Sequence, residues 1–416
     1  MSQQSTYDIL IVGGGAAGSG VAASLLKRDK SLRIAIIEPS HKHYYQAAWT
    51  LVGAGEFDIT KTERDMSNCI PKNVTWIPSA VTIFNPDAKS VKTQGGQDIY
   101  YQQLVVAAGL KIDWDAISGL NKTLGKNGVT SNYRFDLAPY TWELVKNLKF
   151  GTAIFTQPPI PIKCAGAPQK ALYLSCSHWE NIGVLNNIEV DFNNAGAVLF
   201  GVAAYVPPLM QYIERYHAKL SFNSTLIAVD GAAKKATFNV KDANGNITQI
   251  EKGFDMLHVV PPQTSPDFIK QSPLADAAGW VDVNQNTLQH TRYADIFSLG
   301  DVCNSPNAKT VAAARKQVVV IAENLIALRN NQAMPTDYDG YGACPLTVEK
   351  GKVILAEFGF GGKLLPSFPL DSLVPRKINW ILKKYLLPWV YWNALLKGRE
   401  WLARPAAGAT AEQVSK

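Results

Sequence analysis

The chain has 416 residues, which is room for two to three domains. Of these residues 47% are apolar and 18% are charged, a composition that excludes a disordered protein. The formal charge of +7 is a modest basic excess, and we expect no nucleic-acid partner. No stretch approaches the roughly 18 uncharged apolar residues of a membrane-spanning helix, and a first strand beginning at Tyr7 leaves no room for a signal peptide. Five cysteines in so long a chain do not form a disulfide scaffold, so we expect any cysteine pair to be redox-active rather than structural.

The chain opens with the pattern of a dinucleotide-binding unit. An apolar, β-branched run over 7–12 predicts a buried strand, and apolar residues at helical spacing over 19–27 predict a helix. Between them lies Gly-Gly-Gly-Ala-Ala-Gly, a G-x-G-x-x-G motif. Gly13 permits the tight turn, Gly15 lets the backbone approach a pyrophosphate, and Gly18 lets the helix pack on the strand.

The next elements favour this interpretation over a purely structural glycine turn. A second strand over 32–37 ends in Glu38, and an acidic side chain there suits a ribose hydroxyl and would repel a 2′-phosphate. We expect the pyrophosphate at the helix N-terminus, where unpaired N–H groups and the helix dipole favour anions. In the following loop, over 41–46, His41 and His43 either contact the ligand or are solvated, and the sequence leaves both open.

A second α/β unit begins with a strand predicted over 151–156, and it lacks a second glycine fingerprint. Residues 157–168 hold four prolines and Cys164 where a second pyrophosphate would bind. We therefore expect no nicotinamide site. The other elements predicted here are strands over 74–83, 97–101, 104–109, 189–192, 219–229, 235–241 and 256–260, helices over 138–148 and 169–181, and a hairpin turn over 242–246.

The chain then returns to the first domain. A strand over 296–301 ends in Gly300-Asp301, and a helix is predicted over 310–328. In flavoproteins such a Gly-Asp pair binds the ribityl chain and the helix aims its positive end at the flavin, which favours FAD over NAD. The expected FAD contacts are Gly13, Gly15, Ala16, Ala17, Gly18, Glu38, Pro39, Gln46, Ala108, Gly109, Gly300, Asp301, Lys309 and Thr310.

The last segment, from Asp337, is basic and rich in tryptophan. Ile378, Ile381, Leu382 and Tyr385 fall on one helical face, and Pro388 is expected to break the run into two helices. This composition favours a segment lying in a bilayer interface over an amphipathic helix that caps the core. A strand is predicted over 352–358, and the tail from Ala406 is expected to be disordered.

Cys164 and Cys344 are the best candidates for a redox pair, although spacing alone leaves other pairs open. Glycine and proline flank each of them, which predicts loops, and Cys164 precedes a helix N-terminus, where the pKa of a thiol falls. Lys163 and Lys170 are nearby cations that could hold a thiolate. The remaining cysteines, which we expect to be inert, are Cys69, Cys176 and Cys303.

Several stretches resemble the sulfide:quinone oxidoreductases, particularly the type that includes the mitochondrial enzyme. The likeness runs from about Asp8 to Arg399, nearly the whole chain. The stretches that carry it are 163–170 around the first cysteine, 49–55, 275–283, 338–341 together with 344–346, and 391–393.

The resemblance implies that FAD and a Cys164–Cys344 pair oxidise sulfide to a protein-bound persulfide or polysulfide. Electrons would pass to a membrane quinone, and a small acceptor would take the sulfur. No cysteine lies between Cys69 and Cys164, so the FAD is expected to be non-covalent, and no metal is expected. Lys170 and Lys383 are candidate cationic partners of sulfide or quinone oxygens, or else solvated lysines. The candidate quinone contacts are Phe358 and Tyr391.

We therefore expect an α/β fold with two Rossmann-like three-layer domains, as in flavoprotein disulfide reductases, plus a C-terminal amphipathic membrane-associating region. The FAD domain would comprise 1–112 and 286–330, the second domain 113–285 and the C-terminal region 331–416. The expected location is peripheral (monotopic), on a bacterial inner membrane, and whether the chain forms a homo-oligomer stays open. The alternatives are an NADH:quinone reductase-like flavoenzyme and a non-catalytic flavin-binding membrane redox sensor.

Overall fold

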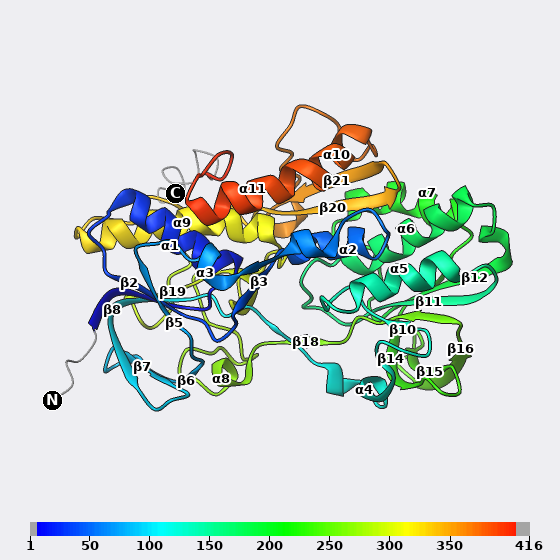
Figure 1. The fold of residues 1–416 in the computed structure, drawn as a ribbon, viewed down its shortest axis with the longest axis horizontal. Coiled ribbons are helices and arrows are strands. Elements are labelled where there is room, and N and C mark those ends of the chain that lie inside the picture. The colour runs from blue at the N-terminus through cyan, green and yellow to red at the C-terminus, as the bar shows by residue number, and fades with distance from the viewer. Residues whose placement is uncertain (1–5, 405–416) are drawn as a thin grey trace.

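Two sheets organise the protein, one in each half of an elongated molecule (Figure 1). The computed structural model describes residues 6–404, so the predicted disorder from Ala406 lies outside the described residues. The C-terminal elements, orange and red in Figure 1, lie along one side and span the junction between the halves. The predicted domain boundaries stay a prediction.

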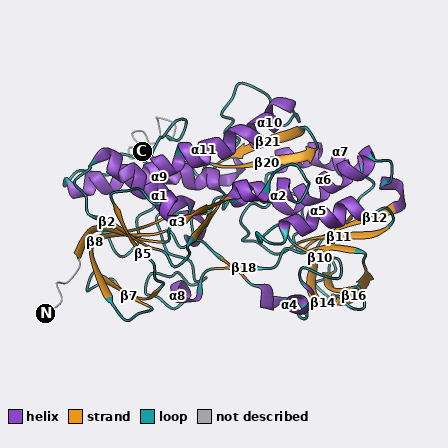
Figure 2. Cartoon of the chain, viewed as in Figure 1, coloured by secondary structure: helices purple, strands orange, loops and turns teal. Residues whose placement is uncertain are grey.

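The first sheet has seven strands in the order β5-β2-β1-β8-β7-β6, with β19 also paired to β8. Its parallel core is apolar and buried, and α1 (Ala16–Arg28) and α9 (Val311–Arg329) pack side by side over one of its faces (Figure 2). The strands are β1 (Thr6–Val12), β2 (Ile34–Ile37), β5 (Val74–Ile77), β6 (Val81–Asn85), β7 (Ser90–Thr93), β8 (Asp98–Val106) and β19 (Ile296–Ser298).

Two strand predictions in this half are wrong. The segment 74–83 is two strands, because Pro78 between them cannot donate a ladder hydrogen bond. The strands predicted over 97–101 and 104–109 are the single strand β8, whose burial changes from alternating at its start to complete at its end. The smaller elements here are β3 (Lys42–Tyr44), β4 (Glu63–Asp65), α2 (Trp49–Val52), α3 (Met66–Cys69) and α8 (Asp267–Lys270).

The second sheet is a five-stranded parallel sheet in the order β10-β17-β11-β12-β13, and a three-stranded antiparallel sheet lies beside it. Its strands are β10 (Val129–Thr130), β11 (Gly151–Gln157), β12 (Ile188–Asn194), β13 (Lys219–Ser221) and β17 (Met256–His258). The antiparallel strands are β14 (Ser224–Asp230), β15 (Lys235–Lys241) and β16 (Ile247–Gly253). The helices are α4 (Leu120–Thr123), α5 (Ala138–Asn147), α6 (Ala167–Asn181) and α7 (Val206–Arg215), and the short pair β9 (Lys111–Ile112) and β18 (Gln263–Thr264) joins the halves.

The hairpin turn predicted over 242–246 is confirmed, since Lys241 pairs with Ile247 across it. The strand predicted over 219–229 is wrong, because the chain leaves the parallel sheet after β13 and enters the antiparallel sheet at β14. Asn223 lies between them with a left-handed backbone, φ 50°. β16 was not predicted, because nearly all of its side chains are exposed and no buried face marks it as a strand.

The C-terminal region contains one hairpin and one long helical run. The hairpin pairs β20 (Gly342–Glu349) with β21 (Lys352–Phe358), so Cys344 lies in a strand and not in the predicted loop. Pro345 is tolerated in β20 because a two-stranded sheet leaves half of its backbone groups unpaired. The expected break at Pro388 is also wrong, since α10 (Lys377–Ile381) continues through a π-helical turn over 382–386 into α11 (Leu387–Asn393). The wider turn accommodates the missing N–H of the proline. None of the described helices is long and apolar enough to span a bilayer.

A clamp of charged groups holds the end of this run on α1. Glu400 accepts a hydrogen bond from Ser24 Oγ at 2.6 Å and forms an ion pair with Arg28, whose guanidinium also contacts Glu323 Oε1 at 3.0 Å. Gly398 has a φ of 64°, and a Cβ there would overlap the backbone of Ala23. The C-terminal segment is therefore fixed to the half that contains the first sheet, and not only to its own hairpin.

Replacing Glu400 with alanine is expected to loosen this segment, because it leaves the Arg28 guanidinium largely buried with one partner fewer. The cost should be about 2–3 kcal/mol, less than for a fully buried pair because Arg28 keeps some solvent contact. Hydrogen exchange of the amides of 394–399 should become faster, whereas the exposed-site control Arg399→Ala leaves it unchanged. Equal protection in Glu400→Ala and the control would contradict the clamp.

Candidate active site

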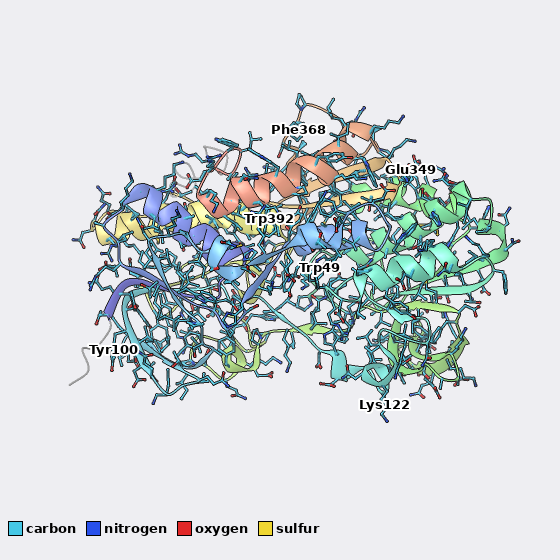
Figure 3. The ribbon with its side chains drawn as sticks, in the orientation of Figure 1. Trp49, Tyr100, Lys122, Glu349, Phe368 and Trp392 are labelled. Atoms are coloured by element: carbon cyan, nitrogen blue, oxygen red, sulfur yellow. The ribbon has the colours of Figure 1, made fainter. Side chains whose placement is uncertain are left out.

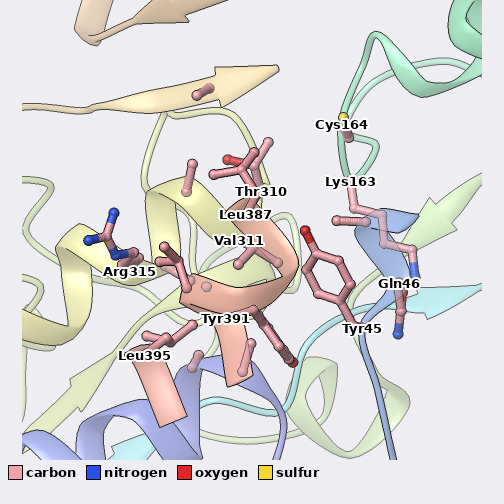
Figure 4. A pocket seen from close by; sticks show the side chains of 18 of the residues that line it. Tyr45, Gln46, Lys163, Cys164, Thr310, Val311, Arg315, Leu387, Tyr391 and Leu395 are labelled. Atoms are coloured by element: carbon pink, nitrogen blue, oxygen red, sulfur yellow. Dashed lines mark hydrogen bonds between the residues drawn. The ribbon is translucent and has the colours of Figure 1, made fainter. Parts of the chain in front are cut away.

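A cavity of about 710 Å³ lies where the two halves and the C-terminal helices meet. Figure 4 shows side chains from several parts of the chain around it, among them Tyr45, Cys164, Thr310 and Tyr391. Trp49 on α2 and Trp392 on α11 lie near this junction (Figure 3). A cavity of this size at a domain junction is a usual place for a ligand.

Most of the predicted cofactor positions line this cavity. Gly13 and Gly18 do not, because they act within the turn: a Cβ on Gly13 would overlap the Ala107 carbonyl, and one on Gly18 would overlap Gly13. Pro39 and Ala108 are also not among the lining residues. The predicted positions that line it are Gly15, Ala16, Ala17, Glu38, Gln46, Gly109, Gly300, Asp301, Lys309 and Thr310.

The lining fits a flavin dinucleotide. A Cβ on Gly15 or Gly109 would meet nothing within 4 Å, so these glycines leave open space and are not there for protein packing. Glu38 accepts hydrogen bonds from the Gly14 and Ser40 amides, both at 2.8 Å, which holds its carboxylate at the mouth of the glycine turn. Thr310 caps α9 by accepting from Ala313 N at 3.2 Å, so the positive end of this helix faces the cavity.

Two polar side chains in the lining are also suited to bind a ligand. Asn132 and Thr50 are buried cavity-lining residues, and their side-chain polar atoms have no hydrogen-bond partner within residues 6–404. Such groups are costly unless a ligand or water satisfies them. Lys309 behaves differently, since its Nζ donates to the backbone carbonyls of Asp301 at 2.7 Å and Cys303 at 3.0 Å. It therefore holds the Gly-Asp loop in place.

The structure brings Cys164 and Cys344 together. Cys164 lies in the loop before α6, with a left-handed backbone of φ 83°, and Cys344 extends from β20. Their Sγ atoms are 3.6 Å apart, and Lys170 Nζ on α6 donates to Cys164 Sγ at 3.2 Å. Cys69, Cys176 and Cys303 are buried at other places and have no cysteine partner within the described chain.

The surroundings make the two thiols unequal. The hydrogen bond from Cys344 holds the pKa of Cys164 well below its usual value, and the charge of Lys170 lowers it further. The same hydrogen bond, together with burial, raises the pKa of Cys344. In the reduced pair, Cys164 is therefore the thiolate and Cys344 the thiol.

Two buried lysines lie beside the pair, so neither is the solvated lysine that the sequence left open. Burial alone would lower the pKa of Lys170, but the charges of Cys164 and Cys344 and the hydrogen bond to Cys164 together outweigh this and raise it. Lys383, on the π-helical turn, is 5% exposed, with its Nζ 3.4 Å from the Ala47 carbonyl oxygen. Burial and the nearby charge of Lys170 lower the pKa of Lys383 to about 7, so it can exchange a proton near neutral pH.

The structure separates the remaining candidates. His43 lines the cavity and contacts Tyr391 Oη through Nε2 at 2.6 Å, and Tyr391 also lines it, whereas His41 is exposed. Phe358 is not brought to the site: side chains alternate along β21, so Glu357 faces the cavity while Phe358 packs on Phe200, with 5.9 Å between ring centroids. This corrects the choice of Phe358 as a quinone contact.

The polar lining residues that sequence reasoning missed include Arg315, Tyr341 and Glu357. Glu357 comes one residue before Phe358 in β21. Because side chains alternate along a strand, it would have been predicted if the inward face of β21 had been known. Arg315 lies in the first turns of α9, whose N-terminus was predicted to face the flavin.

Comparisons with known proteins agree with this geometry. A family model described as pyridine nucleotide-disulphide oxidoreductase matches residues 7–141. The mitochondrial sulfide:quinone oxidoreductase of Dictyostelium discoideum is 43% identical over 394 residues, covering 94% of this chain and 86% of that protein. The protein of the same name from Mus musculus is 38% identical over 392 residues, covering 94% and 87%. The X-ray structure of the sulfide:quinone oxidoreductase from Aquifex aeolicus aligns with a TM-score of 0.76 at 19% identity, covering 95% of this chain and 92% of that one, a likeness that shows the fold alone.

Replacing Lys170 with methionine is expected to raise the pKa of Cys164, because the thiolate loses its nearest cation. In the reduced protein, the midpoint of the pH profile for alkylation of Cys164 by iodoacetamide should move up by about 1–3 pH units. Mass spectrometry of the alkylated peptide gives this midpoint. The exposed control Lys61→Met should keep the original profile, and an unchanged midpoint in Lys170→Met would show that Lys170 does not stabilise the thiolate.

Proposed function

The chain belongs to the sulfide:quinone oxidoreductase family, and we propose that it oxidises sulfide at the Cys164–Cys344 pair and passes the electrons through FAD to a membrane quinone. The observation that carries this proposal is the 3.6 Å contact between two sulfurs that lie 180 residues apart in sequence, beside a cavity lined by the predicted FAD positions. FAD, when bound there, accepts two electrons from the cysteine pair and gives them to the quinone.

The unequal thiols assign the roles in the sulfur chemistry. When HS⁻ attacks the oxidised pair at Cys344, the bond between the two cysteines breaks and a persulfide forms on Cys344. Cys164 leaves as the thiolate, which is the group that Lys170 stabilises. A small acceptor then removes the outer sulfur, and the two cysteines form their bond again while they release two electrons to the cofactor. Each turn therefore oxidises one sulfide by two electrons.

The C-terminal helices support docking on a membrane. Most of the large apolar side chains that are exposed in the described residues lie between 364 and 402, and we call this set the C-terminal apolar face. On the same helical run, Asn379 and Lys383 point inward and are buried, and Lys384 forms an ion pair with Glu56 at 2.8 Å. The members of the face are Leu364, Phe368, Leu370, Val374, Ile378, Ile381, Tyr385, Leu386, Trp389, Trp401 and Leu402.

The cavity opens within this face, because five of its members also line the cavity: Phe368, Leu386, Trp389, Trp401 and Leu402. A quinone could thus pass from the lipid to the cavity along an apolar path. We propose a peripheral membrane location on this basis. The relatives from Dictyostelium discoideum and Mus musculus are mitochondrial proteins by name, while the bacterial inner membrane, the sulfur acceptor and a homo-oligomer stay predictions.

Cys164→Ser and Cys344→Ser are each expected to keep FAD but to lose reduction of the flavin by sulfide, since neither can form the cysteine pair. Anaerobic titration with sulfide, followed by flavin absorbance, measures this, and Cys176→Ser is the control that should behave as the wild type. Full bleaching in either active-site variant would contradict the mechanism. Bleaching of the wild type by NADH would favour an NADH:quinone reductase, and bleaching by sulfide without reoxidation by a short-chain quinone would favour a redox sensor.

Replacing Ile381 and Tyr385 with glutamate is expected to prevent flotation with anionic liposomes, because it places two charges in the C-terminal apolar face. Truncation at about Leu370 should have the same effect. The matched control is Ile247→Glu, an equally exposed isoleucine on β16 in the second half, which should float as the wild type does. Flotation of the double variant would place the membrane contact elsewhere on the molecule.

A further inference from the structure

A buried carboxylate lines the cavity, and the sulfur chemistry above does not use it. Glu357 on β21 is 3% exposed. The register of the hairpin pairs it with Ala343, the residue before Cys344, and both line the cavity. Its backbone is fixed separately, since Glu357 N donates to Tyr205 Oη at 3.1 Å. The carboxylate is thus held on the cavity face of the hairpin, the opposite face from Cys344.

Hydrogen bonds connect Glu357 both to the cavity and to the surface. Tyr341 Oη donates to Glu357 Oε1 at 2.5 Å, and Tyr341 is itself a buried lining residue. Ser367, which is exposed and also lines the cavity, donates to the same carboxylate through Oγ at 2.5 Å and through its amide at 3.0 Å. Proton-carrying groups therefore run from the exposed rim at Ser367 through Glu357 to the buried hydroxyl of Tyr341.

Two cationic side chains of α9 lie beside these hydrogen-bonded groups. Lys316 Nζ lies 4.2 Å from the centroid of the Tyr341 ring and 3.8 Å from Asp339 Oδ2. Arg315 also lines the cavity, and its Nε has no hydrogen-bond partner within residues 6–404. Burial raises the pKa of Tyr341, and the neighbouring Glu357 carboxylate raises it further, so the hydroxyl keeps its proton at rest.

We infer that Glu357 and Tyr341 conduct a proton from solvent at Ser367 to the quinone. The inference rests on the proposed function. Reducing a quinone to a quinol consumes two electrons and forms two O–H bonds, and a cavity that opens within an apolar face supplies little water for them. Lys383 is placed to provide one proton, and the Glu357 chain provides the other.

The transfer balances without any further reactant. The two electrons come from sulfide by way of FAD, as proposed above. Glu357 takes a proton from water at the Ser367 end. Tyr341 then gives its hydroxyl proton to a quinone oxygen and receives the proton of Glu357, which restores the carboxylate. The O–H bond of Tyr341 breaks and forms again, and the quinone gains one proton.

The test separates the two half-reactions in the FAD-loaded protein. The enzyme is reduced anaerobically with two equivalents of sulfide, the second of which takes the outer sulfur from the persulfide. It is then mixed with a short-chain ubiquinone analogue in a stopped-flow instrument. Glu357→Gln keeps the size and shape of the side chain and one of its two accepting oxygens, but it cannot take up a proton. We expect flavin reduction by sulfide at the wild-type rate and reoxidation by the quinone slowed by about 10²-fold, the usual size of a lost proton-transfer catalyst. Tyr341→Phe should show the same pattern.

Two further measurements distinguish proton transfer from a structural role. The solvent deuterium isotope effect on reoxidation should change in Glu357→Gln, and Glu357→Asp should recover part of the rate. The control is Glu349→Gln, the other buried glutamate of the hairpin, which pairs with Arg215 outside the cavity and should leave both half-reactions unchanged. Wild-type reoxidation with an unchanged isotope effect in Glu357→Gln would overturn the inference while leaving the proposed function intact. If sulfide does not reduce the flavin of the wild-type enzyme, the proposed function itself is refuted.

Discussion

The contact between Cys164 and Cys344 is the constraint on which the active site depends. Neither half of the molecule can make it alone, because one sulfur comes from a loop of the second half and the other from the C-terminal hairpin. The hairpin is held by apolar packing, since Cys344, Leu346 and Val348 belong to the same buried cluster as Ala171 and Cys176 of α6. Because both cysteines rest on this shared core, packing fixes the distance between their sulfurs.

Burial of this contact determines the electrostatics of the cavity. A thiolate in an apolar environment is unfavourable unless a cation lies close to it. Lys170 satisfies that need at 3.2 Å and is itself stabilised by the thiolate. Burial, and after it the nearby charge of Lys170, lower the pKa of the second buried lysine, Lys383, to about 7, so its own proton is held weakly. The buried site thus holds a thiolate on one side and a proton donor on the other.

The sequence predicted those parts of the site that local physics determines. Gly13 and Gly18 have no room for a Cβ, Glu38 binds the glycine turn, and Thr310 caps α9, and each of these roles depends on neighbours in the same unit. It failed where the answer depends on which face of an element points inward. Along β21 the alternation of side chains puts Glu357, which was not predicted, on the cavity face and turns Phe358 away from it. His41 and His43 are two residues apart and carry the same strand signal, so only the structure shows that His43 in β3 is buried and that His41, just before β3, is exposed. Pro345 likewise suggested a loop, because nothing in the sequence shows that β20 belongs to a sheet of only two strands.

The burial of Lys383 explains why the C-terminal helices present apolar residues to the outside. Residues four apart share a helical face, so placing Lys383 in the cavity also places Asn379 inside, and both are buried. Residues two positions apart lie on opposite sides, so Ile381 and Tyr385 must then point outward, and each is more than half exposed. An ordinary amphipathic helix would turn the other way and bury its isoleucines. The position of one lysine therefore fixes the orientation of the whole run, and it links a proton donor inside the cavity to an apolar surface outside it.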